Sequence, residues 1–159
     1  MDCSVEATEL KTGKSVNKTI DPAAFKYFYI DIGSSPSNDL IFTTKKKSNA
    51  NLELLLLFTK PSNYSIPNFF DHDGYATISI SNLDQSSTLQ YEVLKSYANS
   101  GKTRLMLAVY NYDSASTSDI VLSLKTGAGI RWVNIIIPNF SQVVKMMMMK
   151  QLVMQLCMQ

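Results

Sequence analysis

The feature that most constrains this chain is a set of segments in which apolar and polar residues alternate with a period of two. The clearest are residues 25–32, 51–59, 104–112 and 119–124. Successive side chains of a β-strand point to opposite faces, so this period predicts strands with one buried face. Clusters of Ser, Asn, Asp, Gly and Pro separate the segments, as expected for turns between antiparallel strands. The sequence therefore predicts an all-β fold, an antiparallel β-sandwich.

We expect strands near residues 4–9, 15–20, 25–32, 39–44, 51–60, 75–81, 89–93, 104–112 and 119–125. The pair 39–44 and 51–60 is expected to form a hairpin around the basic run Lys45-Lys46-Lys47, which we interpret as a solvated turn that discourages edge pairing. The period of two places one set of side chains on the inner face: Phe28, Ile30, Leu54, Leu56, Leu105, Leu107, Val109, Leu122 and Leu124.

Length and charge limit the class of protein. A chain of 159 residues is long enough for one domain with a real core, and 45% hydrophobic with 18% charged residues is typical of globular proteins. The net charge of +2 is too small to indicate nucleic acid or an anionic membrane as a partner. The first residues, with Asp2 and no apolar stretch behind a basic one, do not predict a signal peptide.

The composition changes after Gly129, so we divide the chain into a β-sandwich domain, residues 1–129, and a C-terminal part, residues 130–159. Residues 130–138 could form one more strand. The Met-rich tail that follows is expected to be helical or disordered, and we expect the whole part to be dispensable for folding. Its longest apolar stretch, residues 143–154, is interrupted by Lys145 and Lys150, and a membrane span needs about 20 apolar residues.

A long irregular segment, residues 61–74, holds the sole histidine in the sequence Asp71-His72-Asp73-Gly74. Loops of this length in a compact domain tend to be functional. Asp71 and Asp73 could supply oxygen ligands to Ca²⁺, the one cofactor that the sequence suggests. His72 could instead be the base of a hydrolase, although no G-x-S-x-G motif occurs. The favoured interpretation is an Asx-type turn that leads into the next strand.

Aromatic residues provide a second candidate site. Tyr64 and Tyr75 lie in or beside the long segment, and Tyr110 and Tyr112 end a predicted strand. Such rings can serve as platforms for a glycan or a matrix protein when polar groups stand beside them. Phe69 and Phe70 could contribute, but two adjacent Phe residues rarely both stay exposed, so we expect them to pack on the core.

Three N-x-S/T motifs are potential glycosylation sites: Asn17, Asn63 and Asn139. Asn63, in the long segment, is the best candidate because an acceptor needs exposed backbone. An Asn- and Ser-rich chain also produces such motifs by chance.

Four segments in order carry a resemblance to a known family: residues 25–30, 52–57, 102–111 and 119–124. Over residues 16–126 the chain resembles the bacterial pre-peptidase C-terminal domain, which is kin to the collagen-binding domains of clostridial collagenases. The resemblance implies a jelly-roll-like sandwich of about eight to ten strands, extracellular in most members. Glu53, Leu56 and Arg104 depart from the family pattern, so we transfer no ligand-binding residue.

The leading hypothesis is a non-catalytic module of a larger extracellular or secreted protein that binds glycan, matrix or a neighbouring domain. The alternatives are a hydrolase with its site near His72 and a purely structural spacer. An enzyme would require His72 within hydrogen-bond distance of a Ser hydroxyl and a carboxylate.

Overall fold

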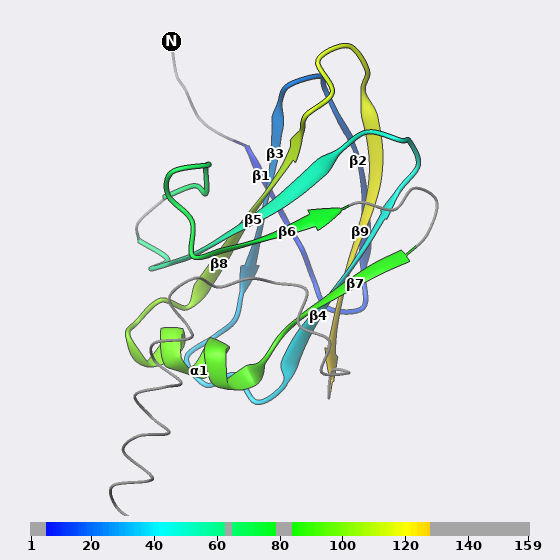
Figure 1. Ribbon diagram of the computed structural model, residues 1–159. Helices are drawn as coiled ribbons and strands as arrows, with labels where there is room; N and C mark the ends of the chain where they lie inside the picture. The colour runs from blue at the N-terminus through cyan, green and yellow to red at the C-terminus, as the bar shows by residue number, and fades with distance from the viewer. Residues whose placement is uncertain (1–5, 63–64, 79–83, 128–159) are drawn as a thin grey trace, which may run out of the picture.

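The computed structural model describes residues 6–62, 65–78 and 84–127, which form two packed sheets and one short helix (Figure 1). The strands are β1 (Ala7–Glu9), β2 (Ser15–Ile20), β3 (Phe25–Asp31), β4 (Asp39–Lys46), β5 (Leu52–Thr59), β6 (Gly74–Ile78), β7 (Asp84–Leu89), β8 (Arg104–Asn111) and β9 (Ser118–Gly127), and the helix is α1 (Tyr91–Asn99). One sheet has the order β1-β3-β8-β5-β6 and the other β2-β9-β4-β7. The predicted all-β sandwich is confirmed.

The antiparallel ladders follow the plan of a jelly roll. β2 pairs with β9, β3 with β8, β4 with β7 and β5 with β6. The chain is therefore arranged as one long hairpin that is folded over on itself, and its successive pairs alternate between the two sheets. β1 adds to the edge of the five-stranded sheet in parallel with β3.

The core lies between the two sheets, and all nine side chains that the alternation assigned to the inner face are part of it. α1 closes one end of this core with Val93 and Leu94. The helix ends at Asn99, and the chain turns away at Gly101, whose positive φ of 80° suits a residue without a side chain. Within the described residues no helix reaches the length and apolarity that a membrane crossing requires.

A buried amide fixes the end of β8. Asn111 is fully buried, and its Nδ2 donates to the backbone carbonyls of Ser116 at 2.9 Å and Asp21 at 3.3 Å. Its Oδ1 accepts from the backbone N–H of Asp113 at 3.0 Å. These bonds join the β2–β3 turn to the β8–β9 loop, and a buried amide with satisfied partners specifies one arrangement of the two.

Two expectations about local structure are wrong. Residues 39–44 and 51–60 are not a hairpin, because β4 and β5 lie in different sheets. Residues 89–93 are not a strand, because β7 ends at Leu89 and α1 begins at Tyr91. The buried side chains Val93, Leu94 and Ala98 follow a helical period, and the N–H of Tyr91 at the start of the helix donates to Asp39 Oδ1 at 2.8 Å.

The interpretation of the run Lys45-Lys46-Lys47 as a solvated turn is wrong for Lys46, which is buried in β4. Lys45 is exposed, but Lys46 occupies an inner position of β4 with 1% of its surface exposed. Its Nζ donates to the carbonyl of Ala50 at 2.8 Å. The same alternation that places Phe42 inside continues through Lys46, so the strand extends two residues beyond its predicted end.

We expect Leu107→Ala to destabilise the domain by about 2–5 kcal/mol, because it opens a cavity between the sheets. Val121→Ala, at a half-buried position of β9, is the matched control and should cost less than half as much. Chemical denaturation measures both. Equal losses would show that the inner face has been assigned wrongly.

Burial lowers the pKa of Lys46. The folded state therefore binds this proton less tightly than the unfolded chain, whose lysine pKa is about 10.4. The cost of burying the charge is fully present below the lowered pKa and disappears as pH rises toward the unfolded value. We expect the stability of wild type relative to Lys46→Met to rise between pH 7 and pH 10.5. Lys45→Met is the control. Thermal unfolding across this pH range should show no comparable rise in the stability of wild type relative to Lys45→Met.

Candidate binding site

The outer faces of the two sheets differ in chemistry. One row across the four-stranded sheet consists of Ser15, Ser123, Thr43 and Ser86. The corresponding row across the five-stranded sheet consists of Tyr27, Ala108, Leu55 and Tyr75. A solvated outer face normally carries polar residues. The five-stranded sheet is therefore the one whose outer face needs a cover or a ligand.

The loop between β5 and β6 contacts this apolar face through Phe69. It leaves β5 at Thr59, which pairs with Arg104 at one end of the face. Its Phe69 ring contacts Phe25 and Tyr110 at the other end, with ring centroids 5.3 Å and 4.8 Å apart. The chain then returns to β6. Between these ends the outward side chains are buried: Leu55, Leu57, Met106 and Ala108.

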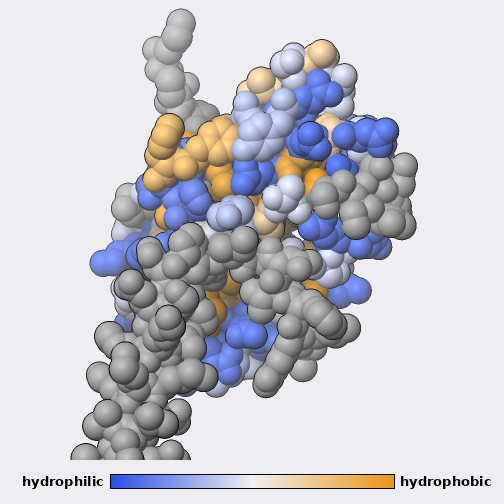
Figure 2. Space-filling view, viewed as in Figure 1, coloured by the Kyte–Doolittle hydropathy of each residue, from blue (hydrophilic) through white to orange (hydrophobic). Residues whose placement is uncertain are grey.

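Five rings gather where the loop meets the sheet, and we call them the aromatic platform: Phe25, Tyr27, Phe69, Tyr110 and Tyr112. Tyr110 is central, because its ring touches those of Phe25, Phe69 and Tyr112 at centroid distances of 4.6 Å, 4.8 Å and 4.8 Å. Phe69 is 38% exposed and Tyr112 51% exposed. Figure 2 shows hydrophobic side chains gathered over this loop and the neighbouring strands.

A carboxylate stands at the rim of the platform. The hydroxyl of Tyr112 donates a hydrogen bond to Glu53 Oε2, from the strand next to β8. This hydrogen bond is the main cause that raises the pKa of Tyr112 to about 12. The Tyr112 backbone N–H is held as well, by the carbonyl of Asn51 at 2.9 Å. The platform therefore combines apolar ring faces with a fixed polar edge, as recognition of a polar ligand requires.

The expectation that Phe69 and Phe70 pack on the core is wrong. Phe69 contacts the outer face and not the interior, and Phe70 is 100% exposed. Asn68 explains the turn that exposes them: its Oδ1 accepts from the N–H of Phe70 at 2.8 Å and from that of Asp71 at 3.0 Å. This is the Asx-type turn favoured from the sequence, although it begins at Asn68.

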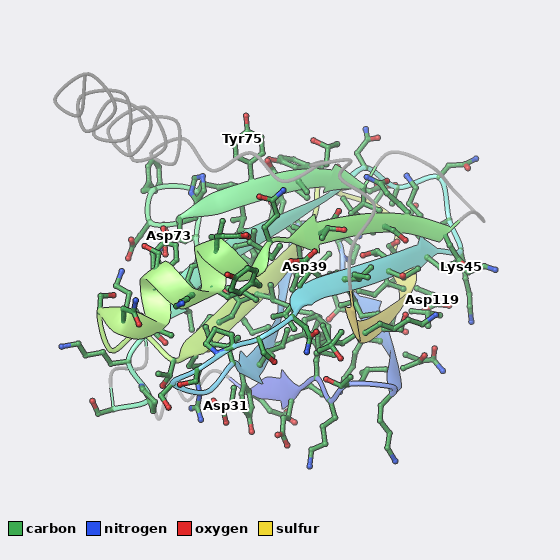
Figure 3. The ribbon with its side chains drawn as sticks, turned by 90° about the horizontal axis from the view of Figure 1, so that it is seen from below. Asp31, Asp39, Lys45, Asp73, Tyr75 and Asp119 are labelled. Atoms are coloured by element: carbon green, nitrogen blue, oxygen red, sulfur yellow. The ribbon has the colours of Figure 1, made fainter. Side chains whose placement is uncertain are left out.

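Asp73 has a structural role at the base of the loop. Its Oδ2 accepts from the backbone N–H of Phe58 at 2.7 Å. Burial and the Asp73 carboxylate together raise the pKa of Tyr97 to about 12, and the Tyr97 ring stacks on Phe58 with centroids 3.8 Å apart. Figure 3 shows Asp73 beside α1. The residue thus connects loop, strand and helix.

The described residues contain no group of three or more His, Cys, Asp or Glu that could hold a metal ion. Asp71 is exposed, and Asp73 points to the Phe58 amide. Calcium binding at these two residues stays a prediction. His72 Nδ1 lies 3.2 Å from the carbonyl of Asn68, and within the described ranges its ring has no Ser hydroxyl or carboxylate partner.

The remaining sequence-based candidates are dispersed. Tyr75 lies on the outer face of β6, where its ring meets that of His72 at 6.0 Å, apart from the platform. Asn17 is exposed on β2, and the hydroxyl of its motif partner Thr19 donates to Asp119 Oδ1 at 2.6 Å. Tyr64, Asn63 and Asn139 lie outside the described residues, as do residues 130–138 and the Met-rich tail.

The sequence analysis found Tyr110 and Tyr112 but missed Phe25, Tyr27 and Glu53. The signal was present in the alternation: once Phe28 is assigned to the inner face, Phe25 and Tyr27 must point outward. The neighbours of these residues across the sheet could not be read from the sequence, because pairing between β3 and β8 joins distant segments.

The calcium prediction can be tested with one carboxylate at a time. Asp73→Asn should lower the melting temperature with and without calcium, because it weakens the bond to Phe58 N–H. Asp71→Asn leaves that bond intact. If calcium binds here, added calcium raises the melting temperature of wild type over that in chelator, and Asp71→Asn reduces the increase. Equal melting temperatures of wild type in calcium and in chelator would remove calcium from this loop.

Comparison with known proteins supports the fold of this chain and does not identify a family. No family model and no curated protein sequence matches this chain. Among solved structures, the chain is similar to the pre-peptidase C-terminal domain of collagenase from Bacillus anthracis, with a TM-score of 0.51 and 12% sequence identity. The match covers 79% of this chain and 100% of that domain. The resemblance inferred from the order of the strand motifs is therefore confirmed at the level of the fold.

Proposed function

We propose that the chain is a non-catalytic binding module that holds a glycan on the aromatic platform. The observation that carries the proposal is the cluster of five rings connected through Phe25 and Tyr110, with Tyr112 half exposed and Glu53 at its edge. Flat rings can cover the apolar face of a sugar, while a carboxylate accepts hydrogen bonds from its hydroxyls.

Rigidity supports a binding role. Phe25, Tyr27 and Tyr110 belong to paired strands, so their backbone is already ordered before a ligand arrives. Ordering a binding surface on association costs free energy, and a preformed platform reduces this cost. The fully exposed Phe70 beside Phe69 extends the apolar surface that a ligand can cover.

A matrix protein is the second candidate ligand. Its support is the likeness in fold to a domain of a collagenase. On either alternative we place the module in a larger extracellular or secreted protein, in which it brings another part of that protein to its target. A hydrolase site at His72 has less support, because the one polar partner of its ring among the described residues is a backbone carbonyl.

The test is co-sedimentation of the chain with insoluble cellulose, insoluble chitin and collagen fibrils. We expect Tyr112→Ala to weaken glycan binding by about tenfold or more, or about 1.4 kcal/mol, as for other aromatic anchors of an interface. Tyr112→Phe keeps the ring and removes the hydroxyl, so it separates stacking from the bond to Glu53.

Val121→Ala, on the outer face of the other sheet, is the matched control and should bind as wild type does. Binding to collagen fibrils alone, with the same loss in Tyr112→Ala, would identify the matrix alternative. Binding that Tyr112→Ala and Phe70→Ala leave unchanged would move the site away from the platform, and no retention on any of the three solids would contradict the proposal.

A further inference from the structure

We propose that the aromatic platform selects amino sugars, because the carboxylate of Glu53 binds the protonated amine of a sugar unit that lies on the ring of Tyr112. This selectivity rests on the glycan-binding function proposed above and narrows the ligand to a cationic polymer of glucosamine. The rings bind sugars in general, and Glu53 is the residue that determines which sugar is preferred.

Glu53 differs from the other carboxylates on the outer face of the five-stranded sheet. The acidic residues that face outward from the described strands of this sheet are Glu9 on β1, Asp31 on β3 and Glu53 on β5. Glu9 forms an ion pair with Lys11 at 3.1 Å, and Asp31 forms one with Arg104 at 2.7 Å. Among the described residues Glu53 has no basic partner, so its negative charge is left for a ligand.

One oxygen of the Glu53 carboxylate is available to a ligand. Oε2 accepts the hydrogen bond from the hydroxyl of Tyr112, and Oε1 has no donor within the described ranges. This hydrogen bond, with desolvation as a second cause, raises the pKa of Tyr112 to about 12, so the tyrosine stays neutral. The pair therefore carries one negative charge and one free acceptor, which an ammonium group can engage.

The strands beside Glu53 bring no competing cation to the outer face. Its outward neighbours across the sheet are Tyr110 on β8 and Thr77 on β6. Lys26 has the opposite parity to the platform residues of β3 and faces the other side of that strand. Arg104 is about 20 Å from Tyr110 along β8, well beyond the screening length of about 8 Å at physiological salt. Within the described strands the charge at the platform is therefore negative, which favours a cationic ligand.

Tyr112 offers a protonated amine two interactions at once. Its ring is 51% exposed, and the face of a tyrosine ring attracts a cation. Its hydroxyl edge is bound to Glu53, so an amine over this edge also meets the carboxylate. The exposed rings of Phe69 and Phe70 remain for the apolar faces of the sugar units. An N-acetylated sugar covers the same rings without the charge.

Titration of the full chain with hexamers of glucosamine and of N-acetylglucosamine tests this selectivity, with the Tyr112 amide followed by NMR. The two probes have the same length, and at about pH 5.5 only the first is cationic. We expect wild type to bind the glucosamine hexamer at least about threefold more tightly. About 0.5 M salt should reduce this preference, because it screens the charge of the amine and of the carboxylate.

Glu53→Gln keeps an oxygen that accepts from the Tyr112 hydroxyl and removes the charge. We expect this variant to bind the N-acetylglucosamine hexamer as wild type does and to lose the preference for the glucosamine hexamer. Glu9→Gln is the matched control, since it makes the same change in net charge on the same face of the sheet. It should keep the full preference. Melting temperatures of both variants verify that they are folded, and the comparison of the two hexamers in wild type needs no variant.

Equal affinity of wild type for the two hexamers would overturn the selection of amino sugars and leave glycan binding intact. A preference that persists in folded Glu53→Gln would overturn the role of Glu53. Tighter binding of hexalysine than of the glucosamine hexamer would assign the charge to a basic protein segment and overturn the sugar as the ligand. Binding of neither hexamer would overturn the selectivity, and only failure on cellulose, chitin and collagen as well would contradict the proposed function.

Discussion

Burial of the central strands on both faces is the constraint on which the rest of this structure depends. β5 and β8 lie side by side in the five-stranded sheet. Most of their side chains are inaccessible to solvent, both those that point to the inner face and those that point to the outer face. A two-layer sandwich covers only the inner face of each sheet. The outer face of the five-stranded sheet is therefore covered as well, and at one end of this face the Phe69 ring of the β5–β6 loop packs on Phe25 and Tyr110.

The candidate site follows from this requirement. The β5–β6 loop brings Phe69 to Tyr110 on this face, so one segment contributes both to packing and to the candidate site. Asp73 holds the base of the loop against Phe58, and Asn68 sets the turn at its tip. The outer face of the four-stranded sheet, with its row of Ser and Thr side chains, needs no cover, and its described strands show no comparable cluster of rings.

Alternation sufficed to predict the fold class and the inner face, because burial of one face imposes a period of two that distant pairing does not alter. It failed where local pattern and tertiary context disagree. β7 reads as polar, since only Leu89 at its end is apolar, and Lys46 is inside although its charge indicates solvent. The platform was half predicted: Tyr110 and Tyr112 are neighbours in sequence, but Glu53 joins them only through the pairing of β5 with β8.

The order of the ladders determines when each strand can find its partner during folding. Among the antiparallel pairs of the folded hairpin, β5 and β6 are closest in sequence, and each further pair, β4 with β7, β3 with β8 and β2 with β9, encloses a longer stretch of chain. Loop closure becomes more costly with length unless inner pairs have already shortened the distance. The sandwich should therefore assemble as a zipper that begins at β5–β6 and ends at β2–β9. On the ribosome the five-stranded sheet cannot be completed until β8 has emerged, and the four-stranded sheet not until β9 has, so the unfinished chain must stay soluble with its future core exposed.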